Sequence, residues 1–212
     1  MPYDLSVRGW MSENELMIIE QLAQQVPENG IIVEIGSMMG RTACAWAMSA
    51  HPSVKIYCLD MWSGDDTHNI NVPYEECIKY GYPIEGDFNT VETFQKNTQK
   101  FSNIIPIHVS DPFLVPHDML NLSSNVVFID ASHKNPNDWF LISYWMKKII
   151  PGGILCGHDL MSHFPDVEEN VKKIEDILLK SVTRYPTNSL WSFLIDPVSS
   201  SLKKEVISEK TQ

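Results

Sequence analysis

The sequence lacks several features that would indicate whole classes of protein. Its four cysteines form no Cys-x-x-Cys pair, which argues against a metal-binding or redox role. No apolar run approaches the ~18 residues that cross a bilayer, and the amino-terminal residues lack the layout of a signal peptide. We therefore expect reduced core cysteines, no membrane partner and a cytoplasmic location.

Basic residues are also few. The chain has 16 Lys and Arg against 27 Asp and Glu, so its formal net charge is −11. A nucleic-acid backbone or an anionic membrane surface would on average be repelled by this charge. The pairs Lys147-Lys148 and Lys172-Lys173 are most simply solvated faces of helices. We expect neither nucleic acid nor membrane as a partner.

Short apolar runs alternate with helical patterns along the chain. Ser12 and Glu15 form a capping box, and apolar residues follow at helical spacing as far as Val26. Further helices are predicted at 41–48, 91–100, 137–149 and 167–179, and strands at 31–35, 54–59, 104–109, 125–129 and 153–156. Residues 182–185 and 190–195 are predicted to form an antiparallel hairpin. This alternation predicts an α/β fold with a seven-stranded, mostly parallel sheet, an antiparallel C-terminal edge strand and helices on both faces.

A single domain is predicted for residues 1–198. Residues 61–87 are a long polar and aromatic stretch between elements, which we interpret as an insert that forms a lid over the site. Residues 199–212 are expected to form a polar tail. The amino-terminal helix and the insert are both candidate contacts in a homo-oligomer, and nothing in the sequence chooses between them.

Polar residues gather where the predicted strands end. In parallel α/β sheets, ligands bind outside the carboxyl ends of the strands, so these residues are expected to face one crevice. They are Glu34, Gly36, Asp60, Ser110, Asp111, Asp130, His158 and Asp159.

The loop after the first strand, Glu34-Ile-Gly-Ser-Met-Met-Gly40, indicates a ligand site. Glycine lets the backbone approach a ligand closely, and the following helix N-terminus favours anionic groups. Asp60 ends the next strand, where a carboxylate can accept hydrogen bonds from both ribose hydroxyls. The spacing is Gly-x-x-x-Gly and no Walker lysine follows, which disfavours nicotinamide, flavin and ATP sites. A ligand with a ribose but no pyrophosphate fits better, and a tight turn beside a surface aspartate is the alternative.

These motifs resemble a known family. Val33-Glu-Ile-Gly-Ser-Met-Met-Gly-Arg-Thr42 resembles motif I of the class I S-adenosylmethionine-dependent methyltransferases, and Leu59-Asp60 resembles their acidic ribose-binding position. Phe128-Ile-Asp-Ala-Ser-His133 and Gly152-Gly-Ile-Leu-Cys-Gly-His-Asp159 are similar to the small-molecule O-methyltransferase branch that includes macrocin O-methyltransferases and cephalosporin hydroxylase-like proteins. The resemblance covers residues 8–197 and implies a Rossmann-like fold with S-adenosylmethionine as cofactor.

The resemblance also implies cofactor contacts at the matching positions. Gly36, Ser37 and Gly40 would lie against the methionine part of the cofactor, and Glu34 near its amino group. Asp60 would hold the ribose. The remaining cofactor-binding positions are Met61, Trp62, Ser110 and Asp111 around the adenine, and Asp130, Ala131 and His133 towards the sulfonium.

Metal-dependent members of this family bind Mg²⁺ through a carboxylate after the fourth strand and two adjacent residues after the fifth. The matching residues here are Asp130, His158 and Asp159. His158 departs from the usual acid or amide, and its nitrogen suits Mn²⁺, Fe²⁺ or Zn²⁺ better than Mg²⁺. The alternative is that His158 is not a ligand and that it and Asp159 order the loop backbone.

Methyl transfer to a hydroxyl needs a base or a metal, because a hydroxyl is a poor nucleophile until it is deprotonated. His133 matches the position of the base in related O-methyltransferases, and His158 is the second candidate. A solvent-facing His133 and an Asp130 that only caps a helix are the alternatives. Ser132 and Asn135 depart from the family pattern, which affects the expected substrate placement more than the cofactor site.

The function predicted from these observations is S-adenosylmethionine-dependent O-methylation of a small-molecule acceptor, such as a sugar or natural product, with Mg²⁺ or Mn²⁺ assistance. One alternative is a nicotinamide-dependent oxidoreductase, which the glycine spacing disfavours. The other is a non-catalytic protein that binds an S-adenosyl ligand, which would not need Asp130, His133, His158 and Asp159 together.

Overall fold

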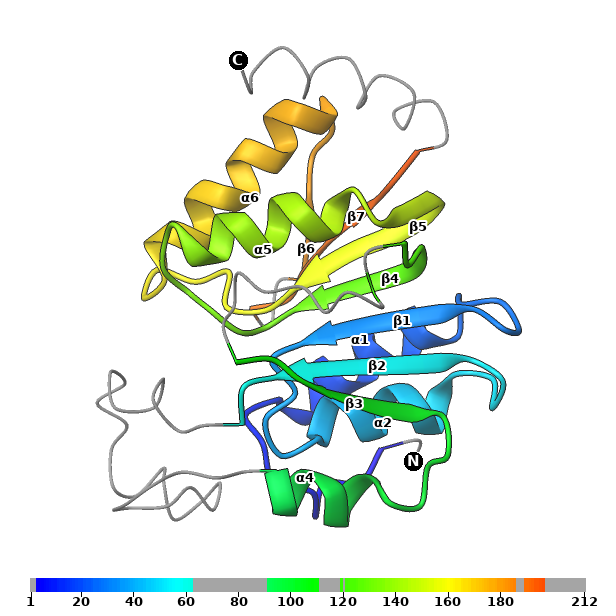
Figure 1. The fold of residues 1–212 in the computed structure, drawn as a ribbon. Coiled ribbons are helices and arrows are strands. Elements are labelled where there is room, and N and C mark those ends of the chain that lie inside the picture. Colours follow the sequence, from blue (N-terminus) through cyan, green and yellow to red (C-terminus); the bar gives the residue numbers. More distant parts are fainter. Residues whose placement is uncertain (1–2, 63–90, 111–118, 120, 186–188, 197–212) are drawn as a thin grey trace.

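The computed structural model describes residues 3–62, 91–110, 119, 121–185 and 189–196 (Figure 1). Most of the predicted insert at 61–87, the cofactor candidate Asp111 and the predicted tail at 199–212 lie outside the described residues. No described helix is long and apolar enough to cross a bilayer.

A seven-stranded sheet lies at the centre of the fold, in the order β3-β2-β1-β4-β5-β7-β6. The first five strands of this order are parallel, and β7 runs antiparallel to both β5 and β6. The predicted seven-stranded, mostly parallel sheet is therefore confirmed. The antiparallel strand β7 is not itself the edge of the sheet, because the two-residue strand β6 lies outside it. The strands are β1 (Ile31–Ile35), β2 (Lys55–Asp60), β3 (Ile104–His108), β4 (Ser124–Ile129), β5 (Ile149–Gly157), β6 (Thr183–Arg184) and β7 (Trp191–Leu194).

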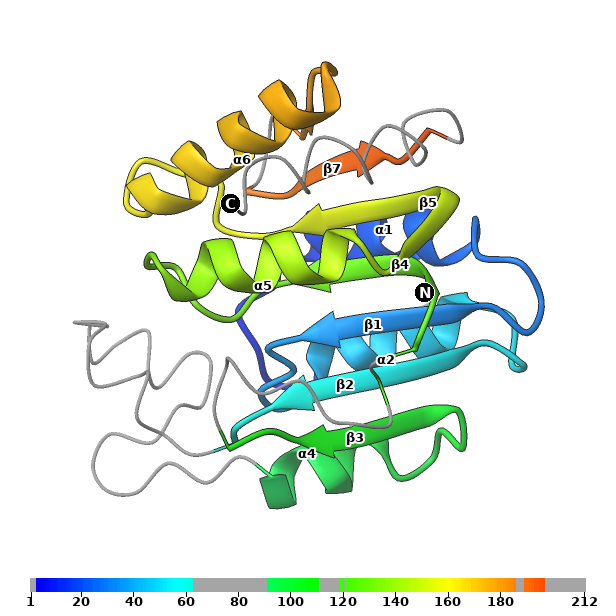
Figure 2. The ribbon, with the colours of Figure 1, turned by 45° about the horizontal axis from the view of Figure 1, so that its top comes forward.

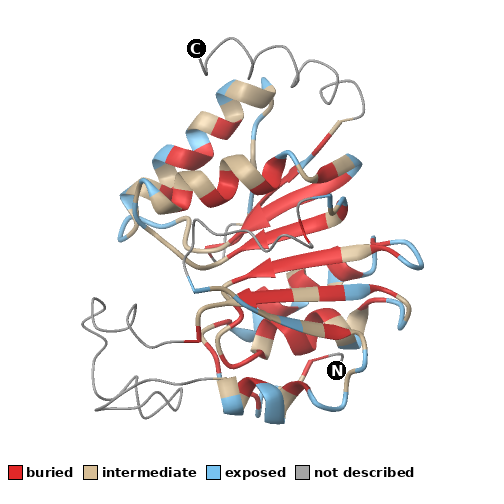
Figure 3. Cartoon of the chain, viewed as in Figure 1, coloured by how far each residue is buried: buried red, intermediate tan, exposed pale blue. Residues whose placement is uncertain are grey.

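Helices cover both faces of the sheet (Figures 1 and 2). On one face, α1 (Glu13–Ala23), α2 (Arg41–Ser49) and α4 (Val91–Thr98) pack over a core that includes Trp46, Phe94 and Phe128. On the other, α5 (Asn137–Met146) and α6 (Pro165–Leu178) pack over a second core that includes Trp145 and Trp191. The central strands β1 and β4 and the second half of β5 are mostly buried, whereas β3 and β6 at the edges of the sheet are mostly exposed or half-buried (Figure 3).

Strand β1 shows how burial on two faces places a carboxylate inside the protein. Successive side chains of a strand point to opposite faces. Val33 and Ile35 belong to the core under α5, whereas Ile32 belongs to the core under α1 and α2. Glu34 therefore points to the same side as Ile32, and it is fully buried.

Strand β5 is longer than the sequence pattern predicts. The helix predicted for 137–149 ends at Met146, and the strand predicted for 153–156 extends from Ile149 to Gly157. The register to β4 shifts between the pairs Ser124–Ile149 and Val126–Ile154, which is a bulge. Pro151 and Gly152 lie in the bulge, and these residues normally indicate a turn, so the strand was not expected to cross them.

Candidate active site

The site lies where strand order reverses, between the carboxyl ends of β1 and β4. This is the position where open parallel sheets bind ligands. The backbones of the two strand ends touch here: an added Cβ on Gly36 would lie 1.8 Å from the carbonyl oxygen of Asp130, and the φ of Gly36 is +88°. Only glycine fits this contact, so the loop from Gly36 to Gly40 is held directly against the residue that ends β4.

Beneath this loop, Glu34 is a buried carboxylate without a hydrogen-bond partner among the residues that the structure describes. The same holds for the hydroxyl of Ser37. Burial raises the pKa of Glu34 well above its usual range; Ser37 beside it acts in the opposite direction, and the carboxylates of Asp130 and Asp60 raise the pKa further. Buried polar groups are nearly always satisfied in folded proteins, so this pair is suited to a ligand or a water molecule that offers a hydrogen-bond donor.

Asp60, at the end of β2, ties the loop to the next segment. Its carboxylate accepts hydrogen bonds from the backbone N–H groups of Met38 and Trp62, each at 2.7 Å. The indole N–H of Trp62 in turn donates to the carbonyl oxygen of Met38 at 2.8 Å. Trp62 is buried, and its ring centroid lies 4.9 Å from that of Phe94. The acidic side chain predicted to hold a ribose therefore also shapes the loop beside it.

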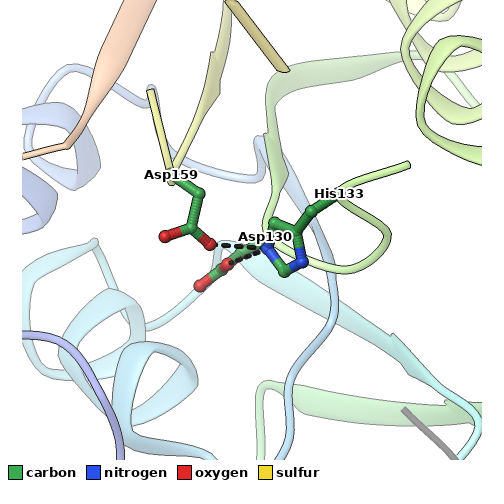
Figure 4. A group of neighbouring side chains, drawn as sticks. All are labelled: Asp130, His133 and Asp159. Atoms are coloured by element: carbon green, nitrogen blue, oxygen red, sulfur yellow. Dashed lines mark ion pairs between the residues drawn. The ribbon is translucent and has the colours of Figure 1, made fainter. Parts of the chain in front are cut away.

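A second cluster, formed by Asp130, His133 and Asp159, lies at the ends of β4 and β5 (Figure 4). Nε2 of His133 is 2.5 Å from Oδ2 of Asp159 and 3.7 Å from Oδ1 of Asp130. Burial disfavours the charged ring, but the hydrogen bonds and charges of the two carboxylates outweigh it and raise the pKa of His133 to about 10. Burial raises the pKa of Asp159, but its contacts with His133 and His158 outweigh this and lower the pKa.

The ring of His133 is also supported by an apolar neighbour. The ring centroid of Phe164 lies 4.5 Å from that of His133, at an interplanar angle of 32°. His133 is therefore fixed on one side by an aromatic ring and at Nε2 by two carboxylates. Its Nδ1 is the ring nitrogen turned away from them (Figure 4).

His158 lies beside this cluster and makes different contacts. Its Nε2 is 2.8 Å from Oε1 of Glu15 and 2.7 Å from Oγ of Ser189, and its Nδ1 is 3.2 Å from Oδ1 of Asp159. Burial opposes protonation, but the carboxylates of Asp130, Asp159 and Glu15 raise the pKa of His158 to about 11. These carboxylates favour the charged form of His158, which bridges the amino-terminal helix and the site.

The cluster of Asp130, His133 and Asp159 could share a metal ion. One ligand atom from each side chain lies within 4.8 Å of the others. For His158, the histidine predicted from the sequence as a ligand, Nε2 faces Glu15 and Ser189, whereas Nδ1 lies 3.2 Å from Oδ1 of Asp159 and 3.8 Å from Oδ1 of Asp130. The geometry thus offers His133 as the nitrogen donor next to the two predicted carboxylates.

The structure brings most of the predicted site residues together in two groups. Glu34, Gly36, Ser37, Gly40 and Asp60 form the loop region, and Asp130, His133, His158 and Asp159 form the cluster region with its neighbour. The half-buried Met61 and Ala131 lie next to these groups in sequence, and Ser110 is exposed after the end of β3.

Glu15, Ser189 and Phe164 contact the cluster region but were not predicted as site residues. Glu15 was recognised only as a capping residue, which it is: it accepts hydrogen bonds from Ser12. Its second contact, with a residue 143 positions away, leaves no local signal in the sequence. Phe164 is the N-cap residue of α6 and Ser189 precedes β7, so both lie outside the regular elements, where sequence periodicity carries no information about contacts.

A sequence family described as a methyltransferase domain matches residues 33–160. The chain belongs to this family. The match begins within β1 and ends after Asp159, so it includes both the glycine loop and the cluster at the ends of β4 and β5. This membership makes the protein a methyltransferase-family protein and implies S-adenosylmethionine as its cofactor. No curated protein sequence matches the chain.

Solved structures share the fold of this methyltransferase domain at low sequence identity. A SAM-dependent O-methyltransferase from Thermotoga maritima is 14% identical, with a TM-score of 0.58 over 91% of this chain and 68% of that one. An rRNA methylase from Streptococcus thermophilus is 12% identical, with a TM-score of 0.57 over 89% and 99%. A precorrin-6y C5,15-methyltransferase from Geobacter metallireducens is 10% identical, with a TM-score of 0.54 over 82% and 74%. These proteins are named for different methylation reactions, so the likeness establishes the Rossmann-like methyltransferase fold alone.

Proposed function

We propose that this protein is an S-adenosylmethionine-dependent O-methyltransferase that acts on a hydroxyl group of a small molecule, such as a sugar or natural product. The observation that carries the proposal is the buried, unpartnered carboxylate of Glu34 beneath the glycine loop. Membership of the methyltransferase family indicates the class of cofactor. The carboxylate–histidine cluster beside the loop contains groups that can transfer a proton.

The loop region fits S-adenosylmethionine. The cationic amino group of its methionine part is a donor that would satisfy Glu34, and a charge-assisted hydrogen bond of this kind is among the stronger ones. Gly36 and Gly40, both at positive φ, let the loop turn tightly against Asp130 and Phe94, and Asp60 offers carboxylate oxygens to ribose hydroxyls. When bound, the cofactor supplies a methyl group on a sulfonium, which an oxygen nucleophile attacks directly.

In this proposal His133 takes the proton of the acceptor hydroxyl. Oδ2 of Asp159 forms an ion pair with Nε2 of His133 and so favours the tautomer with its proton on Nε2, which leaves Nδ1 as the acceptor for a proton. Phe164 limits the rotation of the ring. Because the two carboxylates favour the charged ring, only the neutral fraction of His133 serves as a base, and this fraction grows towards alkaline pH.

As the alternative to this base, we propose a metal-loaded form of the cluster, in which Asp130, Asp159 and Nε2 of His133 would bind a divalent cation and His133 would be a ligand and not the base. Two carboxylate oxygens and one imidazole nitrogen suit Mn²⁺ better than Mg²⁺, which prefers oxygen alone. Such a cation lowers the pKa of a bound hydroxyl. Calorimetric titration of the full chain with Mn²⁺ and with Mg²⁺ tests the site, and Asp159→Asn should weaken the binding. Absence of metal binding by the wild type would remove the metal from the proposal and leave His133 as the base.

The acidic surface charge supports a small-molecule acceptor over nucleic acid, since the chain carries a formal net charge of −11. This matters because rRNA methylases share the fold. A binding assay against RNA at low salt separates the two: we expect no RNA binding, and salt-dependent RNA binding would favour a nucleic-acid acceptor.

Titration calorimetry with S-adenosylhomocysteine is the first experiment. We expect micromolar binding by the wild type and a clear loss in Asp60→Ala. Asp196→Ala, which removes a partly exposed aspartate after β7, serves as the matched control and should bind as the wild type does. No binding by the wild type would contradict a methyltransferase function and leave only the fold.

A further inference from the structure

Glu15 uses its two carboxylate oxygens for two different tasks. Oε2 accepts hydrogen bonds from the backbone N–H and the hydroxyl of Ser12, both at 2.7 Å, and so completes the capping box of α1. Oε1 lies 2.8 Å from Nε2 of His158 and accepts a hydrogen bond from the hydroxyl of Ser189 at 3.3 Å. A capping box requires only the first set of contacts. The second set, and the burial of Glu15 with 6% exposure, need another explanation.

His158 is the next member of the same chain of contacts. Its backbone is fixed, because its N–H donates to the carbonyl oxygen of Ile129 and its own carbonyl oxygen accepts from the indole N–H of Trp191, both at 3.1 Å. Its side chain is then held at Nε2 by Glu15 and Ser189. The remaining nitrogen, Nδ1, faces Oδ1 of Asp159 at 3.2 Å.

Asp159 lies between two imidazole rings. Oδ1 faces His158, and Oδ2 faces Nε2 of His133. The backbone of Asp159 is in the left-handed region, with φ of 58°. Asp159 lies two residues after Gly157, the last residue of β5 that pairs with β4. Ladder hydrogen bonds of the sheet therefore do not orient this side chain, and its two imidazole neighbours do.

We propose that Glu15 and His158 are positioning residues that hold the carboxylate of Asp159 in the orientation that presents Oδ2 to His133. The inference rests on the proposed function, in which His133 is the group that accepts the proton. The side chains of Glu15, His158, Asp159 and His133 contact one another in that order, so each one restricts the orientation of the next. The amino-terminal helix thus contributes a carboxylate that acts on the position of the reacting group through His158.

Imidazole ¹⁵N spectra of the full-length, ¹⁵N-labelled protein at a fixed pH test this inference without an acceptor or a metal. The signals of His133 are assigned by their loss in His133→Gln. In Glu15→Gln the amide keeps an oxygen for the cap of α1 but removes the carboxylate that faces His158. We expect the His133 signals to shift. Glu13→Gln is the matched control, because Glu13 is an acidic residue of the same first turn whose side chain contacts Tyr3, and it should leave His133 unchanged.

A double variant decides whether the effect passes through His158. His158→Gln alone should shift the His133 signals, and adding Glu15→Gln to it should cause no further shift. Unchanged His133 signals in either single variant, or an equal effect of Glu15→Gln with and without His158, would overturn the inference. If Glu15→Gln does not fold, the His133 signals of His158→Gln alone test the inference. Calorimetry with S-adenosylhomocysteine separates the two proposals: a wild type that binds no nucleoside contradicts the function, whereas the coupling of Glu15 to His133 is read from the spectra alone.

Discussion

Oε1 of Glu15 lies 2.8 Å from Nε2 of His158, although the two residues are 143 positions apart in the chain. The contact joins the first turn of α1 to the end of β5. His158 carries a raised pKa because three carboxylates outweigh its burial, and Glu15 carries a pKa lowered to about 2 because its contacts with His158 and Ser12 outweigh its own burial. Removing one partner of such a buried ion pair leaves the charge of the other partner uncompensated. The amino-terminal helix is therefore a structural part of the candidate active site.

Gly36→Ala should destabilise the protein strongly and abolish binding of S-adenosylhomocysteine. The added Cβ would lie 1.8 Å from the carbonyl oxygen of Asp130, and the φ of +88° disfavours any L side chain. Gly152→Ala is the matched control, because Gly152 has a φ of +83° with no atom within 4 Å of the added Cβ. It should cost about 1–2 kcal/mol from backbone strain alone. Urea denaturation of both variants measures the difference, and equal losses would show that the contact with Asp130 relaxes without consequence.

Glu34→Gln should weaken S-adenosylhomocysteine binding and stabilise the protein in the absence of ligand. A buried carboxylate without a partner opposes folding when it is charged, and the neutral amide does not carry that charge. Loss of a charge-assisted hydrogen bond to the ligand is worth about 1.5–3 kcal/mol, which corresponds to roughly a 10- to 150-fold rise in the dissociation constant. Calorimetry and thermal unfolding at neutral pH give the two numbers. A variant that binds normally would show that Glu34 does not contact the ligand.

The sequence predicted the elements of the sheet well, because parallel strands that are buried on both faces consist of continuous apolar runs. Ile31–Ile35 was predicted with its observed bounds. The bulge in β5 was missed because Pro151 and Gly152 indicate a turn in any local reading, and only pairing with β4 overrides it. The local sequence pattern therefore predicts a strand where burial determines the composition of the strand. It fails where pairing with another strand determines the bounds.

The candidate site was predictable for a different reason, namely that chain topology brings strand ends together. Asp130 and Asp159 follow β4 and β5, which are neighbours, so their proximity follows from the order of the strands. Which histidine faces them could not be predicted, because it depends on the side-chain direction of His133 and on the contact between His158 and Glu15. Such long-range contacts have no period in the sequence.

The stability of the protein should fall between pH 4 and pH 7 because of Asp138. Burial raises the pKa of this side chain from 3.8 to about 6, although the amide of Asn170 donates a hydrogen bond to it at 2.8 Å and acts in the opposite direction. The folded protein therefore binds this proton more tightly than the unfolded chain does, so the contribution is fully present below pH 3.8 and is lost as pH rises through about 6.

The shift corresponds to about 3 kcal/mol. Urea denaturation between pH 4 and pH 7 should show a loss in the free energy of unfolding that is about 3 kcal/mol larger in the wild type than in Asp138→Asn, where this residue cannot titrate. Glu34, whose pKa is also raised, contributes equally to both proteins. Asp176→Asn, at an exposed position on α6, controls for the change in net charge. Parallel profiles for the wild type and Asp138→Asn would contradict the prediction.

His133→Gln should remove catalysis while leaving cofactor binding intact. His133 contacts Asp130, Asp159 and Phe164 rather than the glycine loop, so S-adenosylhomocysteine affinity should stay within about twofold of the wild type. Loss of a general base lowers the rate by about 10²–10⁴-fold. The assay uses a hydroxylated acceptor found by screening the wild type, and His163→Gln, at an exposed position before α6, is the control. Retained turnover in His133→Gln would exclude His133 as the base, and an equal loss of nucleoside affinity would place His133 in the cofactor site instead.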